Sequence, residues 1–209
     1  MLELLAITND RFPVKELALS IIEMQESIDY IHIREKSKSV QELYLLLQLL
    51  RREKVRVEKI VVHDRLDLAL LNGIPNVHLP GHGLPVYQVK KRFPELRIGR
   101  SVHSFHEAKS AEQEGADYVL FGHVFDTKCK AGMPGRGLDE FSKIKKALDI
   151  PAYAIGGITL CKLDLVRRAN AAGAAVMSGI FDSEDPVESA LEYSIKAKAH
   201  VDISISQAK

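Results

Sequence analysis

Residues 97–122 read RIGRSVHSFHEAKSAEQEGADYVLFG and contain a complete strand–helix–strand unit. The short apolar run at 118–122 is typical of a buried strand, and residues 97–102 are predicted as the strand before it. Between them, Ser104 supplies an N-cap for a helix over 104–114, and Gly115 ends that helix. Strands that alternate with helices in this way indicate a parallel sheet covered by helices.

The same alternation extends over the whole chain. Strands are predicted over residues 3–8, 30–34, 60–63, 77–79, 97–102, 118–122, 152–155 and 175–177. Helices are predicted over residues 13–25, 39–52, 66–71, 85–92, 104–114, 138–148, 162–170 and 187–198. Eight units leave about 26 residues for each, which is the lower size limit of a (β/α)8 barrel. A doubly wound open sheet is the alternative, but no G-x-G-x-x-G follows the first strand. We therefore predict one α/β domain over residues 1–209, a TIM barrel with a frayed tail over about 199–209.

Composition excludes several classes of protein. Lys and Arg number 29 against 28 Asp and Glu, so the net charge of +1 favours neither nucleic acid nor an anionic membrane as a partner. The apolar run 43–50 is too short to span a bilayer. The start at residues 1–5 lacks a basic n-region, so we expect a cytoplasmic protein without a signal peptide. Cys129 and Cys161 are too far apart in sequence to suggest a disulfide framework. A homo-oligomer is compatible with the sequence.

Small residues follow the last two predicted strands. Gly156 and Gly157 come after the seventh strand, and Ser178 and Gly179 after the eighth. In many barrels these two loops bind a phosphate through backbone N–H groups, and glycine lets an anion approach the backbone. The pattern predicts phosphate binding; the alternative is that the two glycines only make the turn into the next helix.

Two cations follow the second strand. Arg34 and Lys36 are two residues apart, so both side chains point the same way in an extended chain. At a barrel mouth they predict a carboxylate or diphosphate ligand. The alternative is an ion pair with Glu35 or Glu107 on the surface.

Histidines near strand ends raise the question of a metal site. His63 and Asp64 offer two ligands, but a structural turn is the favoured interpretation. Two other pairs have a spacing that zinc uses, yet the sequence shows no third ligand for them: His78 with His82, and His103 with His106. We therefore predict no metal and no cofactor.

Seven stretches together resemble the thiamine phosphate synthase superfamily over essentially the whole chain. In order they are IREK (33–36), DRLDLA (64–69), VHLP (77–80), GRSVHS (99–104), GADYV (115–119), AIGGI (154–158) and MSGI (177–180). The resemblance implies a (β/α)8 barrel, in agreement with the count of units.

Three departures bear on the activity that the resemblance implies. Synthases of this kind hold magnesium diphosphate with an Asn-Asp pair after strand 3 and an Asp after strand 4. Here the pair is His63-Asp64, and the second loop, LPGHG at 79–83, has no carboxylate. In the loop after strand 6, His123 replaces a proline and Cys129 a threonine. These departures predict loss of synthase activity and resemble the TenI (thiazole tautomerase) branch.

That branch implies an isomerase that converts a carboxylated thiazole phosphate tautomer into the aromatic thiazole. His123 is then the acid/base that moves the proton. Arg34 and Lys36 face the ring carboxylate, and the phosphate binds at Gly156, Gly157, Ser178 and Gly179. Ser101, Thr127 and Lys130 are predicted secondary contacts with the ligand. Two alternatives stay open: a thiamine phosphate synthase that joins a pyrimidine diphosphate to a thiazole phosphate, and a non-catalytic regulatory barrel that binds such a phosphate.

Overall fold

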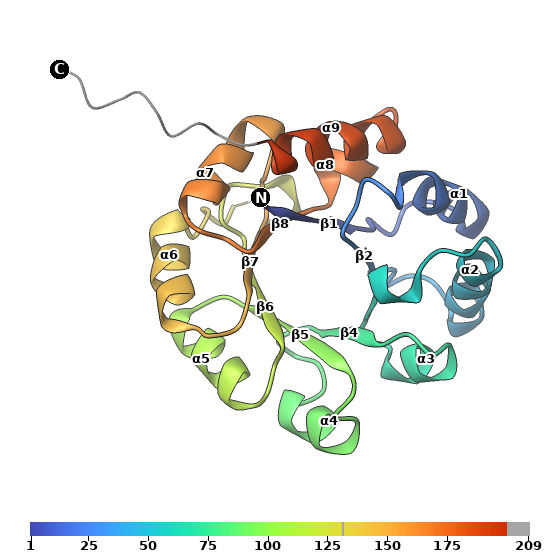
Figure 1. Ribbon diagram of the computed structural model, residues 1–209, viewed down its shortest axis with the longest axis horizontal. Helices are drawn as coiled ribbons and strands as arrows, with labels where there is room; N and C mark the ends of the chain where they lie inside the picture. The colour runs from blue at the N-terminus through green and yellow to red at the C-terminus, as the bar shows by residue number, and fades with distance from the viewer. Residues whose placement is uncertain (131, 200–209) are drawn as a thin grey trace.

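The chain folds into a closed barrel of eight parallel strands, seen from one end in Figure 1, a computed structural model that describes residues 1–130 and 132–199. Each strand pairs with the next in the sequence, and β8 closes the ring by pairing with β1, where Glu3 lies opposite Gly173. The predicted (β/α)8 fold is confirmed. The strands are β1 (Glu3–Ile7), β2 (Tyr30–Ile33), β3 (Ile60–His63), β4 (Asn76–Leu79), β5 (Arg97–Val102), β6 (Tyr118–Gly122), β7 (Ala152–Ile155) and β8 (Gly173–Val176).

Helices form a ring outside the barrel (Figure 1). They are α1 (Val14–Met24), α2 (Val40–Arg52), α3 (Leu66–Leu71), α4 (Val86–Arg92), α5 (Phe105–Gln113), α6 (Leu138–Ala147), α7 (Leu163–Arg168), α8 (Ser178–Phe181) and α9 (Pro186–Lys198). The sequence did not predict α8, because a single turn is too short to show helical periodicity. The eighth strand, predicted over 175–177, spans Gly173–Val176.

Local signals explain where several helices begin. Ser39 and Glu42 form a reciprocal capping box at the start of α2. The side chain of Ser104 accepts a hydrogen bond from the backbone N–H of Glu107 at the start of α5, as predicted. Asp185 caps α9 in the same way, and Pro186 occupies the first helical position, where its missing N–H costs nothing.

The apolar core has two parts. One lies between the strands and the helices, and the other fills the barrel with the inward residues of alternate positions, among them Leu5, Leu120 and Tyr153. The fully buried ring of Tyr118 lies across Gly99, where a Cβ atom would be only 2.0 Å from the ring. The Arg97 guanidinium lies 4.3 Å from the centroid of the Tyr118 ring. The interior is therefore packed with side chains and is not a channel.

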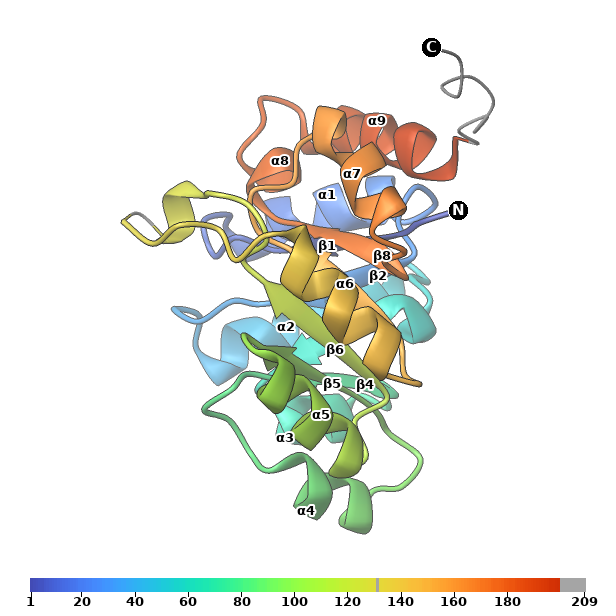
Figure 2. The same cartoon turned by 90° about the vertical axis from the view of Figure 1, so that its left-hand side faces the viewer.

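The carboxyl ends of the strands form the mouth. Figure 2 shows the segment between β6 and α6 projecting from the barrel at the end opposite the N-terminus. Most of the predicted tail, residues 200–209, lies outside the described residues. Among the described helices, none has the length and apolar character needed to cross a membrane.

Candidate active site

A cavity of about 590 Å³ opens at the mouth of the barrel. Nine of the ten residues predicted for the site line it: Arg34, Lys36, Ser101, His123, Thr127, Lys130, Gly156, Gly157 and Ser178. The tenth, Gly179, does not; a Cβ atom there would lie 2.3 Å from the hydroxyl of Tyr193, so its small size serves the packing of α9. The barrel therefore gathers residues that are far apart in the sequence into one cavity.

The two cations after β2 lie in the loop that follows the strand, which ends at Ile33. Thr8 fixes the start of this loop, because its hydroxyl accepts a hydrogen bond from the backbone N–H of Arg34 (2.8 Å). Glu35 pairs with Lys38, and Glu107 accepts a hydrogen bond from the backbone of His103. The surface ion pair considered for Arg34 and Lys36 is thus not formed.

These cations have room for an anionic ligand. Among residues 1–130 and 132–199, no carboxylate oxygen lies within 4.0 Å of a side-chain nitrogen of Arg34, Lys36 or Lys130. Lys130 belongs to a short 3-10 helix, Lys128–Lys130, in the loop after β6. Arg34 and Lys36 after β2, and Lys130 in the loop after β6, thus line the cavity without carboxylate partners, which favours a ligand with several negative charges.

The glycines after β7 form the opposite edge of the cavity. Gly156 has φ of +100° and Gly157 has φ of +64°, conformations that favour glycine. A Cβ atom on Gly157 would lie 2.3 Å from the carbonyl oxygen of Asp126. Within the described residues, the backbone N–H groups of these two glycines donate no hydrogen bond. They are therefore available to an acceptor in the cavity.

The loop after β6 is held against this edge. The backbone N–H of Val124 donates to the carbonyl of Ile155 (2.9 Å), and that of Phe125 donates to Gly156 (3.1 Å). These bonds hold the start of the loop that carries Thr127 and Lys130. His123 is 7% exposed, and its Nε2–H donates to the carbonyl oxygen of Met133 (3.1 Å). The His123 ring thus holds the second half of the loop at Met133, and the backbone N–H of Arg136 donates to the carbonyl of His123 (2.8 Å), which joins the two ends of the loop.

Magnesium held as the resemblance implies does not fit these residues. The cavity is lined by two carboxylates, Glu35 and Asp64, and Glu35 is engaged by Lys38. The loop after β4 adds only Pro80, Gly81 and His82 to the lining. Mg²⁺ requires a nearly octahedral shell of oxygen ligands, and the protein offers one carboxylate that is not engaged by a cation.

Sequence comparison identifies the family. The sequence pattern of the family described as thiamine monophosphate synthase matches residues 4–180. The chain belongs to this family. A thiamine-phosphate synthase from Caldivirga maquilingensis is 32% identical over 189 residues, which are 90% of this chain and 92% of that protein. One from Chlorobium limicola is 41% identical over 168 residues, 78% of this chain and 79% of that protein.

Solved structures agree with this assignment. The thiamine phosphate pyrophosphorylase from Pyrococcus furiosus superposes with a TM-score of 0.81 at 33% identity, covering 94% of this chain and 95% of that one. A 3-hexulose-6-phosphate synthase superposes with a TM-score of 0.74 at 15% identity, covering 92% of this chain and 98% of that one, and shares the fold. This member of the thiamine monophosphate synthase family therefore matches relatives over most of its own length and most of theirs.

The tautomerase prediction is wrong. The relatives at 32–41% identity are named thiamine-phosphate synthase, and the similar structure is a thiamine phosphate pyrophosphorylase. These names agree with the alternative considered above, a thiamine phosphate synthase that joins two substrates. The family is one of enzymes. The prediction gave too much weight to a few departures, His63, the loop at 79–83, His123 and Cys129, in a chain that otherwise matches the synthase pattern over seven stretches. The acid/base role of His123 depended on the tautomerase reaction and is not retained.

Proposed function

We propose that the chain catalyses the thiamine-phosphate synthase reaction. The thiazole nitrogen of a thiazole phosphate attacks the methylene carbon of a pyrimidinylmethyl diphosphate. A C–N bond forms, the C–O bond to the diphosphate breaks, and pyrophosphate leaves with the electron pair. The observation that carries the proposal is one cavity with Arg34 and Lys36 on one side, after β2, and the unbonded N–H groups of Gly156 and Gly157 on the other side, after β7.

The cationic wall suits the leaving group. Arg34 offers a guanidinium fork that binds two phosphate oxygens, while Lys36 supplies a point charge beside it. Lys130 adds a third positive charge from the loop after β6, on the side of the glycines. Negative charge builds up on the diphosphate as the C–O bond breaks. Cations placed there in advance stabilise the transition state more than the ground state, which is how they accelerate the reaction.

The glycine edge suits the phosphate of the second substrate. Gly156 and Gly157 present backbone N–H groups, and Ser178 adds a hydroxyl donor from the start of α8. With a phosphate at this edge and the diphosphate at the opposite wall, the thiazole lies between the two and faces the carbon that it attacks. Holding both substrates in one cavity converts a bimolecular step into an effectively unimolecular one.

The experiment is an assay of thiamine phosphate and pyrophosphate release by purified protein with both substrates and Mg²⁺ in the buffer. We expect turnover by the wild type. Lys36→Gln should lower kcat/KM by about 10–100-fold, because a hydrogen bond to a charged group contributes roughly 1.5–3 kcal/mol. Lys15→Gln, which removes an exposed lysine of α1, is the matched control and should behave as wild type. Absence of product from wild-type protein that binds thiazole phosphate would refute the proposal.

A further inference from the structure

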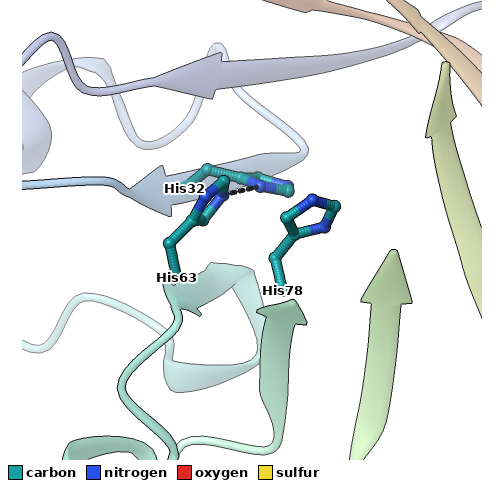
Figure 3. Close-up of side chains that lie close together, drawn as sticks. All are labelled: His32, His63 and His78. Atoms are coloured by element: carbon teal, nitrogen blue, oxygen red, sulfur yellow. Dashed lines mark hydrogen bonds between the residues drawn. The ribbon is translucent and has the colours of Figure 1, made fainter. Parts of the chain in front are cut away.

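Three histidine side chains converge inside the barrel just below the cavity. His32 of β2, His63 at the end of β3 and His78 of β4 turn their rings toward one another (Figure 3). The ring centroids of His63 and His78 are 4.5 Å apart, and those of His32 and His63 are 5.0 Å apart. One nitrogen from each ring can be chosen so that all three lie within 4.8 Å of one another.

The hydrogen bonds of these rings leave one buried nitrogen of the cluster without a partner. His32 Nδ1 lies 2.7 Å from His63 Nε2. His78 Nε2 lies 2.7 Å from the Ser101 hydroxyl, and His78 Nδ1 lies 3.4 Å from the Tyr118 hydroxyl. His32 is fully buried, and its Nε2 has no hydrogen-bond partner within the described part of the chain. A buried polar atom without a partner is costly and calls for a ligand or a further function.

The protonation of the rings suits coordination of a metal. Burial lowers the pKa of His32 and His63 well below the usual value for histidine, and it lowers the pKa of His78 to about 3. The rings are therefore neutral near pH 7, the form in which imidazole binds a metal.

We propose that His32, His63 and His78 bind one divalent metal ion that prefers nitrogen ligands, such as Zn²⁺. Three imidazoles are a common ligand set for zinc sites that keep a fourth position open. With Zn–N bonds of about 2.0–2.1 Å, tetrahedral ligands are roughly 3.3 Å apart, so each nitrogen has to move by less than about 1 Å. The site does not depend on the proposed function.

The ion has a route of entry and a free face. His63 is partly exposed and lines the cavity, whereas His32 and His78 are buried beneath it. The open position therefore faces the cavity. Arg34 and Lys36 near His63 oppose a bound cation, so we expect weaker binding than at a structural zinc site closed by thiolates.

Metal binding to the full chain without substrates tests the proposal. After treatment with a chelator, titration calorimetry should show one Zn²⁺ per chain, and millimolar Mg²⁺ should not compete. His63→Asn and His32→Gln should each weaken binding at least as much as loss of an outer-sphere partner, about 10–100-fold. The matched control is His82→Asn, which removes an exposed histidine of the cavity wall outside the cluster and should bind as wild type.

Spectroscopy of the wild type keeps the test decisive if a variant fails to fold. Co²⁺ in place of Zn²⁺ should give the intense visible bands of a four-coordinate site, and X-ray absorption should show three imidazole nitrogens around the metal. The proposal fails if wild type binds no Zn²⁺. It also fails if folded His63→Asn binds as wild type, or if His82→Asn is the variant that loses the metal.

Discussion

Replacing Gly157 by alanine should cost both stability and binding of the thiazole phosphate. Gly157 has φ of +64°, where an L-residue costs about 1–2 kcal/mol. Its new Cβ would also lie 2.3 Å from the Asp126 carbonyl oxygen and 2.9 Å from Phe125, mostly against backbone that cannot turn aside. Overpacking of this kind typically adds about 1–3 kcal/mol. The edge of the cavity must shift, so the N–H groups of Gly156 and Gly157 lose their positions.

The chain contains a matched control for this experiment. Gly73, after α3, has nearly the same φ, +65°, but a Cβ there would meet no atom within 4 Å. Gly73→Ala therefore isolates the backbone cost. Urea unfolding of both variants should give a larger loss for Gly157→Ala by about 1–3 kcal/mol. The KM for thiazole phosphate should rise about tenfold or more in that variant alone, since a factor of ten needs only about 1.4 kcal/mol. Equal stability losses and an unchanged KM would refute the reasoning.

Three further predictions concern the fold. Ser39→Ala removes the capping box of α2 and should lower the free energy of unfolding by about 1 kcal/mol; a loss below about 0.3 kcal/mol would contradict the role of the cap. Gly99→Ala should lower the free energy of unfolding by about 1–3 kcal/mol, because its Cβ meets the Tyr118 ring. In a double-mutant cycle, Gly99→Ala should cost less when Tyr118→Leu has removed the ring; equal costs in both backgrounds would argue against the clash. Asp117→Asn should cost about 1 kcal/mol in urea unfolding, because the carboxylate accepts hydrogen bonds from Lys90 (2.8 Å) and from the backbone of β5; an unchanged midpoint would show that these bonds contribute nothing.

The barrel was predictable because the same sequence of strand, helix cap and helix recurs along the chain. Each unit pairs a short apolar run with an amphipathic helix, and caps such as Ser39 and Ser104 mark where helices begin. The prediction was less accurate where side chains are small. The start of β8, Gly173-Ala174-Ala175, carries little apolar signal, although β8 pairs fully with β1.

The lining of the cavity was predictable because strand ends meet at one mouth. The positive φ of Gly157 was not predictable, because it depends on how closely Phe125 and Asp126 of the loop after β6 pack against this glycine. The histidine cluster was missed for a different reason. The sequence suggests pairs close along the chain, such as His78 with His82, whereas the cluster takes one residue from each of three strands. Its one signal is that His32 stands two residues before Arg34, so that in an extended chain both side chains point to the same side.

The pairing of β8 with β1 also bears on how the chain folds during synthesis. Until β8 emerges from the ribosome, one edge of β1 has no partner, and about 170 residues separate the two strands. At roughly 5–20 residues per second, this edge stays open for about 10–30 s. An open edge can pair with another chain, so association between nascent copies competes with closure of the ring. The last strand to be made thus completes the sheet and also protects the first.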